Sequence, residues 1–500
     1  MVSDSTRPTD PPRTPLATLA AWLGTDLTGG TGVEVTGISL SSQRIRPGDL
    51  YAALPGARAH GIDFAATAVD AGAVAILTDP AGVERAPVGV PLLVVEHPRS
   101  VLGRLAATVY GDPAASMRMI GVTGTQGKTT TTRLAEGGLE RAGVRSAVIG
   151  TVGTRVAGED VKTALTTPEA PDLHGLFAMM RERGVEACAM EVSSHALVMG
   201  RVDGVVFDVA VFLNLGRDHL DFHADVEEYF QAKASLFTPQ RARLGLVNVD
   251  DEHGRRLVAE ATVPVRTFSA EGREADWRAT DVTLQPDRSS FTVHGPGGRT
   301  IAASCPLPGA FNVVNTLAAI AACVEAGLGE GVAAGIAASG GVPGRMERVD
   351  AGQDFTVVID YAHKPDAVEA ALQALRPLTD GRLVVVLGAG GDRDPGKRPI
   401  MAEIAARLSD LLIVTDDNPR TEAPAAIRAA MLAGVAPGDD AEEIGDRGAA
   451  IREAVRRAAP GDIVLVAGKG HETGQEVDGV VHPFNDRDVV LAALAERVGE

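Results

Sequence analysis

The segment GVTGTQGKTT at residues 121–130 constrains the fold of this chain more than any other. It follows an apolar, strand-like run and opens a helix-like run that extends to residue 142. Glycines at such a turn let backbone N–H groups approach phosphate oxygens, Lys128 can reach terminal phosphates, and the Thr129 hydroxyl can hold Mg²⁺. The spacing departs from GxxxxGK[ST], because Val122 stands where the first glycine would be. We therefore expect a nucleoside triphosphate site on a strand–loop–helix unit; the alternative is an ordinary glycine-rich turn.

Strand-like and helix-like runs alternate through most of the sequence, which is typical of an α/β protein whose parallel sheets are covered by helices. A length of 500 residues, at about 150 residues per domain, suggests roughly three domains. Residues 262–304 differ, because four short runs there resemble antiparallel strands inserted into the second domain. We place a disordered leader at residues 1–14 and domains at 15–112, 113–340 and 341–500.

The composition excludes several classes of protein. Lys and Arg number 47 against 66 Asp and Glu, which gives a formal net charge of −19. This balance argues against a broad nucleic-acid or anionic-membrane surface, although a local cluster of donors can still bind a small anion. The three cysteines, Cys188, Cys305 and Cys323, form no metal-ligand pattern and suit a reducing compartment. No run is suited to spanning a membrane, and we expect a cytoplasmic monomer.

Polar residues follow two further strand-like runs. Glu191 ends one run, at the position where ligands bind in α/β sheets, so it is either a Mg²⁺ ligand or a carboxylate that caps the next turn. The second run precedes NLGRDHLDFH at 214–223. His219 or His223 could bind a metal there, and the alternative is a loop whose polar groups satisfy one another.

Lys233 shares one face of an expected helix with Phe230 and Phe237. A lysine in that position either extends its ammonium to water or is partly buried. Burial favours the neutral amine and makes it available for chemistry. From the residues alone, the extended lysine is the simpler interpretation.

Taken in order, these motifs resemble the Mur ligase family, whose members are ATP-dependent ligases that extend the stem peptide of peptidoglycan. The resemblance covers about residues 36–490. It implies a small N-terminal α/β domain for a UDP-substrate, a central P-loop ATPase domain and a C-terminal Rossmann-like α/β domain for an amino acid. The motifs that carry it are GTQGKTT, TTPEA at 166–170, MEVSSHAL at 190–197, NLGRDHLDFH, YFQAKASLF at 229–237, PGAFNVVN at 308–315, PGRMERV at 343–349, DYAHKPDA at 360–367, GAGGDRDPGKRP at 388–399, DDNPRTE at 416–422 and GKGHET at 468–473.

The resemblance also implies a reaction and the residues that serve it. ATP phosphorylates the γ-carboxylate of a D-Glu, and an amine then attacks the acyl phosphate. The catalytic residues would be Lys128, Glu191, His219 and Lys233. Thr129 and Glu191 would hold one Mg²⁺, and His219 would hold a second together with Lys233, whose counterpart in the family is carbamylated by CO₂ to N6-carboxylysine. The implied ATP contacts are Gly124, Thr125, Gln126, Gly127, Lys128, Thr129, Thr130, Asn312, Asn315, Arg345 and Asp360.

Within the family, the chain resembles the members that add 2,6-diaminopimelate to UDP-N-acetylmuramoyl-L-Ala-D-Glu. Arg420 offers a planar fork to the carboxylate at the far end of diaminopimelate, which lysine lacks, and Glu472 suits an ammonium. The implied contacts of the UDP-sugar peptide are Leu40, Ser42, Thr166, Thr167, Ser193 and Arg201. Those of diaminopimelate are Arg393, Asp417, Asn418, Pro419, Arg420, Gly468 and Glu472.

Three other functions stay open at this point. Arg420 argues against a lysine-adding ligase of the same family. The PGDLYAALPG stretch at 47–56 and the DNPR motif argue against folylpolyglutamate synthase, a relative with a similar ATPase core. A P-loop regulator that binds ATP without ligating anything would tolerate changes of Lys233 and Arg420. The sequence leaves open whether the meso or the LL isomer of diaminopimelate is preferred.

Overall fold

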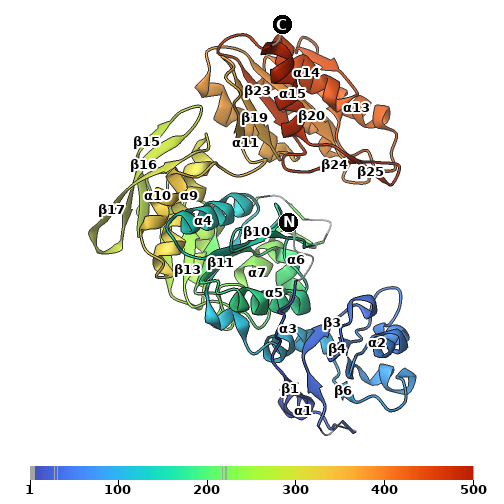
Figure 1. Ribbon diagram of the computed structural model, residues 1–500. Coiled ribbons are helices and arrows are strands. Elements are labelled where there is room, and N and C mark those ends of the chain that lie inside the picture. The colour runs from blue at the N-terminus through green and yellow to red at the C-terminus, as the bar shows by residue number, and fades with distance from the viewer. Residues whose placement is uncertain are drawn as a thin grey trace. The chain divides into compact units, whose positions relative to one another are not determined.

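The computed structural model describes residues 6–27, 29–30, 32–163, 165–216, 218–219 and 222–498. Its internal contacts divide the chain into two units, each of which is described by itself (Figure 1). The first unit comprises the chain up to Arg278 together with residues 294–299 and 317–335, and the second comprises residues 279–293, 300–316 and the chain from Ile336 onward. Among the helices described, none is long and apolar enough to cross a membrane.

The first unit begins with a small four-stranded parallel sheet whose strands follow one another in chain order. Its own core is built from buried aliphatic side chains such as Leu19, Leu50, Leu77 and Leu102. The elements of this part are α1 (Leu16–Leu23), β3 (Gly37–Ser39), β4 (Asp49–Ala52), α2 (Ala65–Asp70), β5 (Ala75–Thr78), β6 (Leu92–Val94) and α3 (Pro98–Val109).

Residues 6–14 correct the expectation of a disordered leader, whereas residues 1–5 lie outside the described residues. Arg7 is only 7% exposed. Its guanidinium forms an ion pair with Asp49 (Nη1–Oδ2 2.6 Å) and donates to the carbonyl oxygen of Ile38 (3.1 Å). Farther on, the short strand β1 (Thr14–Pro15) pairs with β2 (Glu34–Val35). A polar, Pro-rich composition misses this order, because it depends on distant partners: Asp49 for Arg7, and Glu182 for the backbone N–H groups of Thr9 and Asp10.

The central sheet of the first unit places the phosphate loop at its middle. The strand order is β10-β9-β8-β11-β7-β12-β13-β14, and all neighbours from β8 through β11, β7, β12 and β13 to β14 are parallel. The strands are β7 (Arg118–Thr123), β8 (Ser146–Ile149), β9 (Thr154–Val156), β10 (Glu159–Val161), β11 (Ala187–Glu191), β12 (Val209–Phe212), β13 (Gly245–Asn248) and β14 (Val265–Ser269). The helices are α4 (Lys128–Arg141), α5 (Ala170–Glu182), α6 (Ser194–Val198), α7 (Val226–Ala234) and α8 (Glu252–Glu260).

The expected antiparallel insertion at 262–304 is corrected at its first strand. β14 pairs in parallel with β13 and therefore extends the central sheet. It also pairs in parallel with the start of β15 (Trp277–Leu284), and the order continues through β16 (Ser289–Gly295) and β17 (Arg299–Cys305). Helices α9 (Ala310–Glu325) and α10 (Gly331–Ala337) follow. Short strand-like runs do not reveal the direction of pairing, because that direction depends on the connection between strands.

The second unit contains a six-stranded sheet with helices on both faces. Its order is β18-β19-β23-β20-β21-β22, parallel except for the edge strand β18. Alternate residues of β19 and β20 enter two different cores, as the period of a strand requires: one core contains residues from α11, α12 and α13, the other residues from α14 and α15. The strands are β18 (Glu347–Val349), β19 (Thr356–Asp360), β20 (Leu383–Ala389), β21 (Leu411–Asp416), β22 (Ala441–Glu443) and β23 (Ile463–Ala467), with a separate hairpin of β24 (Gly474–Val477) and β25 (Val480–Pro483). The helices are α11 (Pro365–Leu375), α12 (Lys397–Leu408), α13 (Pro424–Leu432), α14 (Arg447–Arg457) and α15 (Asp486–Val498).

The ion pair of Arg7 supplies a test of the ordered leader. In the variant Arg7→Met, the carboxylate of Asp49, which is 2% exposed, loses its buried counter-charge. We expect the free energy of unfolding to fall by about 3 kcal/mol, as measured by urea denaturation. The control Arg13→Met removes an arginine whose side chain is 75% exposed and should change stability by less than about 0.5 kcal/mol. Equal stability of the two variants would contradict the ordered leader.

Candidate active site

The phosphate loop lies at the carboxyl end of β7, between that strand and the start of α4. Gly124 and Gly127 adopt φ angles of 155° and 85°, which side chains with a Cβ disfavour. A Cβ on Gly124 would also lie 3.0 Å from the Cβ of Leu213. The loop therefore needs glycine at both positions that the motif supplies.

Two lysine side chains converge on this loop. The Lys128 Nζ donates to the carbonyl oxygens of Gly124 (2.7 Å) and Thr125 (3.0 Å). The Nζ of Lys233, on α7, donates to the same Gly124 oxygen at 3.0 Å, and this side chain is 1% exposed. Lys233 is therefore buried beside the phosphate loop and does not extend to water. Its ammonium also lies 4.6 Å from the centre of the Tyr229 ring.

Asn214 holds the loop from the neighbouring strand β12. Its Oδ1 accepts hydrogen bonds from the backbone N–H groups of Thr125 (3.0 Å) and Gln126 (2.9 Å). The sequence motif contains Asn214 but assigns it no role. Its place as a polar residue just after the apolar run of β12 could have predicted a contact with the loop.

Glu191 ends β11 next to the loop, since its register partner on β7 is Val122. Its carboxylate is 1% exposed and accepts hydrogen bonds from the backbone N–H (2.8 Å) and hydroxyl (3.1 Å) of Thr151. Glu191 thus caps the turn after β8, and it also places a buried carboxylate beside the phosphate loop. The turn that Glu191 caps precedes it in the chain, whereas we expected a cap on the turn that follows. Its role as a Mg²⁺ ligand stays a prediction, and the carboxylate keeps lone pairs that these two donors do not use.

Four residues expected to hold the UDP-sugar peptide gather beside Glu191. The Thr166 hydroxyl contacts that of Thr151 (3.2 Å), and the Thr167 hydroxyl donates to the Glu191 carbonyl oxygen (2.9 Å). Ser193 caps α6, and Arg201 donates to the Thr167 carbonyl oxygen (3.4 Å). The other two expected contacts lie in the N-terminal part: Ser42 begins the short 3₁₀ helix Ser42–Arg44, and Leu40 precedes it.

Two expected ATP contacts, Thr129 and Thr130, are buried at the start of α4.

His219 belongs to an aromatic cluster near α7. Its ring lies 4.8 Å from that of His195 and 6.0 Å from that of Tyr229, measured between centroids. His195 in turn stacks on Phe222 at 3.9 Å. Because Tyr229 also contacts Lys233 and its hydroxyl lies 3.1 Å from that of Thr125, the cluster joins His219 to the phosphate loop. Arg217, Leu220 and Asp221 of the same motif lie outside the described residues.

The expected adenine and ribose contacts belong to the second unit. The Asn312 amide donates to the Pro308 carbonyl oxygen (2.8 Å), and the Asn315 amide donates to Oδ1 of Asn312 (3.2 Å). Asp360 ends β19 and accepts from the N–H groups of Met346 (2.7 Å) and Ala362 (2.8 Å). Burial raises the pKa of Asp360, and the guanidinium of Arg345 opposes that rise.

The residues expected to bind the amino acid lie at the carboxyl ends of β20, β21 and β23 in the same unit. Nη1 of Arg420 donates to the Gly391 carbonyl oxygen (2.6 Å), and its Nε lies 3.5 Å from Glu476. Gly468 approaches Asp417 so closely that a Cβ would lie 2.6 Å from Oδ2.

Other expected members surround these residues. Asn418 donates to Oε2 of Glu472 (2.9 Å), Pro419 is buried and Arg393 is exposed on the loop after β20. This end of the sheet thus brings a guanidinium and carboxylates together; their role in binding an amino acid stays a prediction.

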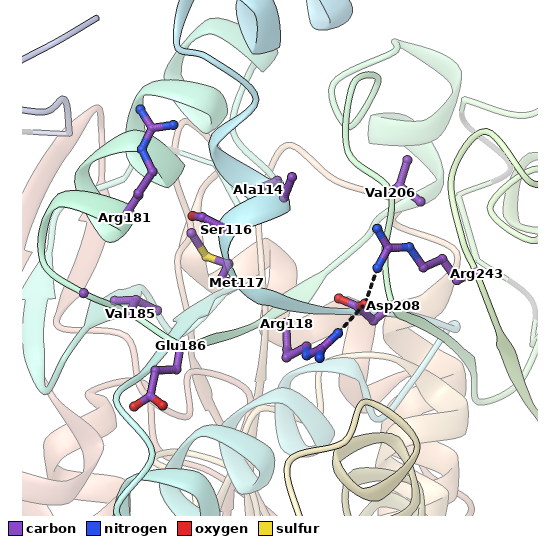
Figure 2. A pocket seen from close by; sticks show the side chains of 12 residues that line it. Ala114, Ser116, Met117, Arg118, Arg181, Val185, Glu186, Val206, Asp208 and Arg243 are labelled. Atoms are coloured by element: carbon purple, nitrogen blue, oxygen red, sulfur yellow. Dashed lines mark hydrogen bonds and ion pairs between the residues drawn. The ribbon is translucent and has the colours of Figure 1, made fainter.

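A cavity elsewhere contains none of the expected site residues. Its volume is about 500 Å³, and it lies at the amino ends of β7, β11 and β12, where Arg118 and Arg243 both contact Asp208 (Figure 2). The phosphate loop is at the opposite edge of the sheet. Ligands of parallel sheets bind at the carboxyl ends of the strands, so we place the chemistry at the loop.

Comparison with known proteins decides the family. Residues 34–110 match the Mur ligase family catalytic domain, residues 122–323 the Mur ligase middle domain and residues 344–470 the Mur ligase glutamate ligase domain. The chain belongs to the Mur ligase family. This confirms the expected family and the α/β fold of three domains, whereas the domain boundaries at 112 and 340 stay a prediction.

The relatives of this Mur ligase carry one recurring name. The chain is 58% identical, over 99% of both chains, to a UDP-N-acetylmuramoyl-L-alanyl-D-glutamate–2,6-diaminopimelate ligase of Streptomyces coelicolor. It is 51% identical to one of Corynebacterium glutamicum, over 93% of this chain and 92% of that one. A solved structure of a ligase with the same name is 33% identical, with a TM-score of 0.69, and covers 94% of this chain and 97% of its own.

Glu136 gives this Mur ligase a testable pH dependence. It lies on α4, 2% exposed, with its carboxylate 2.9 Å from Arg155. Burial raises its pKa from 4.5 to about 7, although Arg155 lowers it. The folded protein therefore binds more protons than the unfolded chain between these two pH values, and the carboxyl's contribution to stability is lost as pH rises through that window.

The variant Glu136→Gln has no titratable carboxyl group at this position. Its free energy of unfolding should therefore fall less as pH rises. Between pH 4.5 and pH 8 we expect the variant to gain about 2–3 kcal/mol relative to the unmodified chain, measured by urea unfolding at both values. All other groups are common to the two proteins and cancel in the difference. A relative loss for the variant would show that the ion pair with Arg155 dominates.

Proposed function

We propose that this Mur ligase joins 2,6-diaminopimelate to the γ-carboxylate of D-Glu in UDP-N-acetylmuramoyl-L-Ala-D-Glu, with conversion of ATP to ADP and phosphate. The observation that carries the proposal is the pocket around Arg420, Asn418 and Glu472 in a chain so similar to ligases of that name. Arg420 matches the distal carboxylate of diaminopimelate. In a lysine-adding enzyme the same guanidinium would face a methylene chain and an ammonium.

The first chemical step makes the carboxylate reactive. A carboxylate is a poor acyl donor, and its negative charge repels the γ-phosphate of ATP. Lys128, at the start of α4, supplies positive charge to the phosphates as the γ-phosphoryl group moves to the carboxylate oxygen and ADP leaves. The resulting acyl phosphate is attacked by the amine of diaminopimelate. The amine loses a proton, phosphate leaves, and an amide bond remains.

The resemblance to the family implies two Mg²⁺ sites, and the residues of this chain suit both. Thr129 and Glu191 would hold one ion, since Glu191 ends β11 and Thr129 lies in the first turn of α4, after the loop that follows β7. His219 and a carbamylated Lys233 would hold the other. Among the described residues no group of three His, Cys, Asp or Glu side chains could hold a metal. A carbamate on Lys233 would add a carboxylate beside the phosphate loop. Bound Mg²⁺ offsets the charge that two anions bring together.

The surroundings of Lys233 favour its modification. Two ammonium groups that donate to one carbonyl oxygen repel each other, and burial strengthens that repulsion. When the neutral amine attacks CO₂ and releases a proton, the repulsion between Lys128 and Lys233 becomes an attraction.

The proposed function also includes a monomeric state and a cytoplasmic location.

Replacement of Lys233 tests this modification. In Lys233→Ala we expect product formation to fall at least about 100-fold, and added formate or acetate should restore part of it by supplying a carboxylate in the vacated space. The measurement is phosphate release from ATP. Lys162→Ala, at an exposed lysine, is the control and should retain full activity. Full activity of Lys233→Ala would contradict the carbamate.

The decisive test of the function compares three amino acids. We expect phosphate release with UDP-N-acetylmuramoyl-L-Ala-D-Glu and diaminopimelate, meso or LL, and a product heavier by that residue, but no release with L-lysine. In Arg420→Met, kcat/KM for diaminopimelate should fall about 100-fold or more, because a charged pair is lost. Turnover with lysine alone would favour the lysine-adding ligase. Absence of turnover with every amino acid would favour the non-ligating regulator.

A further inference from the structure

Lys469 is a buried cation inside the amino-acid pocket to which sequence reasoning gave no role. It follows β23 in the Gly468-Lys469-Gly470 turn and has an exposed fraction of 0%. Removing an ammonium from water costs several kcal/mol unless it is paired and hydrogen-bonded. Its Nζ donates to Oδ1 of Asn418 (2.9 Å) and to Oε2 of Glu472 (2.9 Å). Both partners belong to the set expected to bind diaminopimelate.

These contacts close a three-membered network that orients both partners. The Asn418 amide nitrogen donates to the same Oε2 of Glu472 (2.9 Å), while Oδ1 of Asn418 also accepts from the backbone N–H of Glu476 (3.0 Å). The amide of Asn418 therefore has one orientation. Oε2 of Glu472 already accepts from two donors, whereas Oε1 accepts from one, the hydroxyl of Tyr361 (3.4 Å). Oε1 therefore has the lone pair that an incoming ammonium can use.

The turn that carries Lys469 is built to pass close to its neighbours. Gly468 and Gly470 adopt φ angles of 116° and 54°. A Cβ on Gly470 would lie 2.9 Å from both the Gly344 carbonyl oxygen and the Cβ of Tyr361. Glycine on either side lets the chain enter this narrow space and point the lysine inward.

The charge of Lys469 also affects Glu472. Burial alone would raise the pKa of that carboxyl, but the hydrogen bonds and charge of Lys469 and the amide of Asn418 hold it below its usual value. Glu472 therefore remains a carboxylate in a partly buried site. An ionised carboxylate is what an ammonium ligand needs.

We propose that Lys469 is a positioning residue for the amine of the incoming amino acid: it fixes Oε2 of Glu472 and the amide of Asn418, so that Oε1 of Glu472 faces the ligand. Lys469 does not touch the reacting atoms. This inference rests on the proposed function, because it names Glu472 as the residue that receives the diaminopimelate ammonium. It adds a residue that determines the affinity for the amino acid and leaves the nucleotide contacts unchanged.

A double-mutant cycle tests the proposal by steady-state kinetics on the full-length enzyme. The variants are Lys469→Met, Glu472→Gln and the two combined, with Lys162→Met as a control at an exposed lysine. Lys469→Met should raise KM for diaminopimelate about tenfold or more, while KM for ATP changes less than about twofold. In the Glu472→Gln background, Lys469→Met should add little, because the residue through which it acts is already altered.

Several outcomes would overturn the proposal. An unchanged KM for diaminopimelate in Lys469→Met would do so, as would effects of the two substitutions that simply multiply. Equal rises of KM for all substrates would indicate a purely structural role. Should Lys469→Met fail to fold, Lys469→Gln, which keeps N–H donors, serves in the same cycle. Absence of product with the unmodified chain would overturn the proposed function as well, whereas the outcomes above overturn only the role of Lys469.

Discussion

The carbonyl oxygen of Gly124 accepts hydrogen bonds from Lys128 and Lys233, and the chemistry of the first unit depends on that shared acceptor. The glycine conformation turns the carbonyl toward both side chains, and Asn214 keeps the following N–H groups in place. Two ammonium groups on one oxygen repel each other, and the carbamate proposed on Lys233 would leave Lys128 as the cation of this pair. In a chain with a net charge of −19, such a local cation is what would allow an anionic substrate to bind.

The second unit also places buried cations beside a candidate binding site. Lys469 lies under Asn418 and Glu472, and Arg447 forms an ion pair with Asp486 in which both side chains are 0% exposed. Arg447 also donates to the carbonyl oxygen of Ala467, the last residue of β23. Arg447 therefore supports the end of the strand from which the Lys469 turn begins. In both units, glycine-rich turns at the carboxyl ends of parallel strands bring a lysine to the position where charge is needed.

Sequence patterns predicted local elements well and long-range contacts poorly. The strands at 146–149 and 187–191 can be read from the sequence, because apolar runs there end at Gly or polar residues. The apolar run at 206–213 forms a strand only at Val209–Phe212. The order of residues 6–14, the parallel pairing of β14 and the contact of Asn214 with the phosphate loop all depend on partners far away in the chain. The motifs supplied the candidate residues but gave Lys469 no role. That role depends on its hydrogen bonds to Asn418 and Glu472, which the sequence does not show.

Backbone strain at Arg420 bears on how the pocket works before any ligand arrives. Arg420 adopts a φ of 53°, a left-handed conformation that costs a non-glycine residue about 1 kcal/mol. The backbone is held there by hydrogen bonds from Arg420 N–H to Glu476 (3.0 Å) and from Asp478 N–H to Arg420 (2.7 Å), which align it with β24. The hairpin that orients Arg420 also supplies the Glu476 N–H that orients Asn418. One short hairpin thus orients both Arg420 and Asn418, so the proposed contacts to a carboxylate and to an ammonium would share one support.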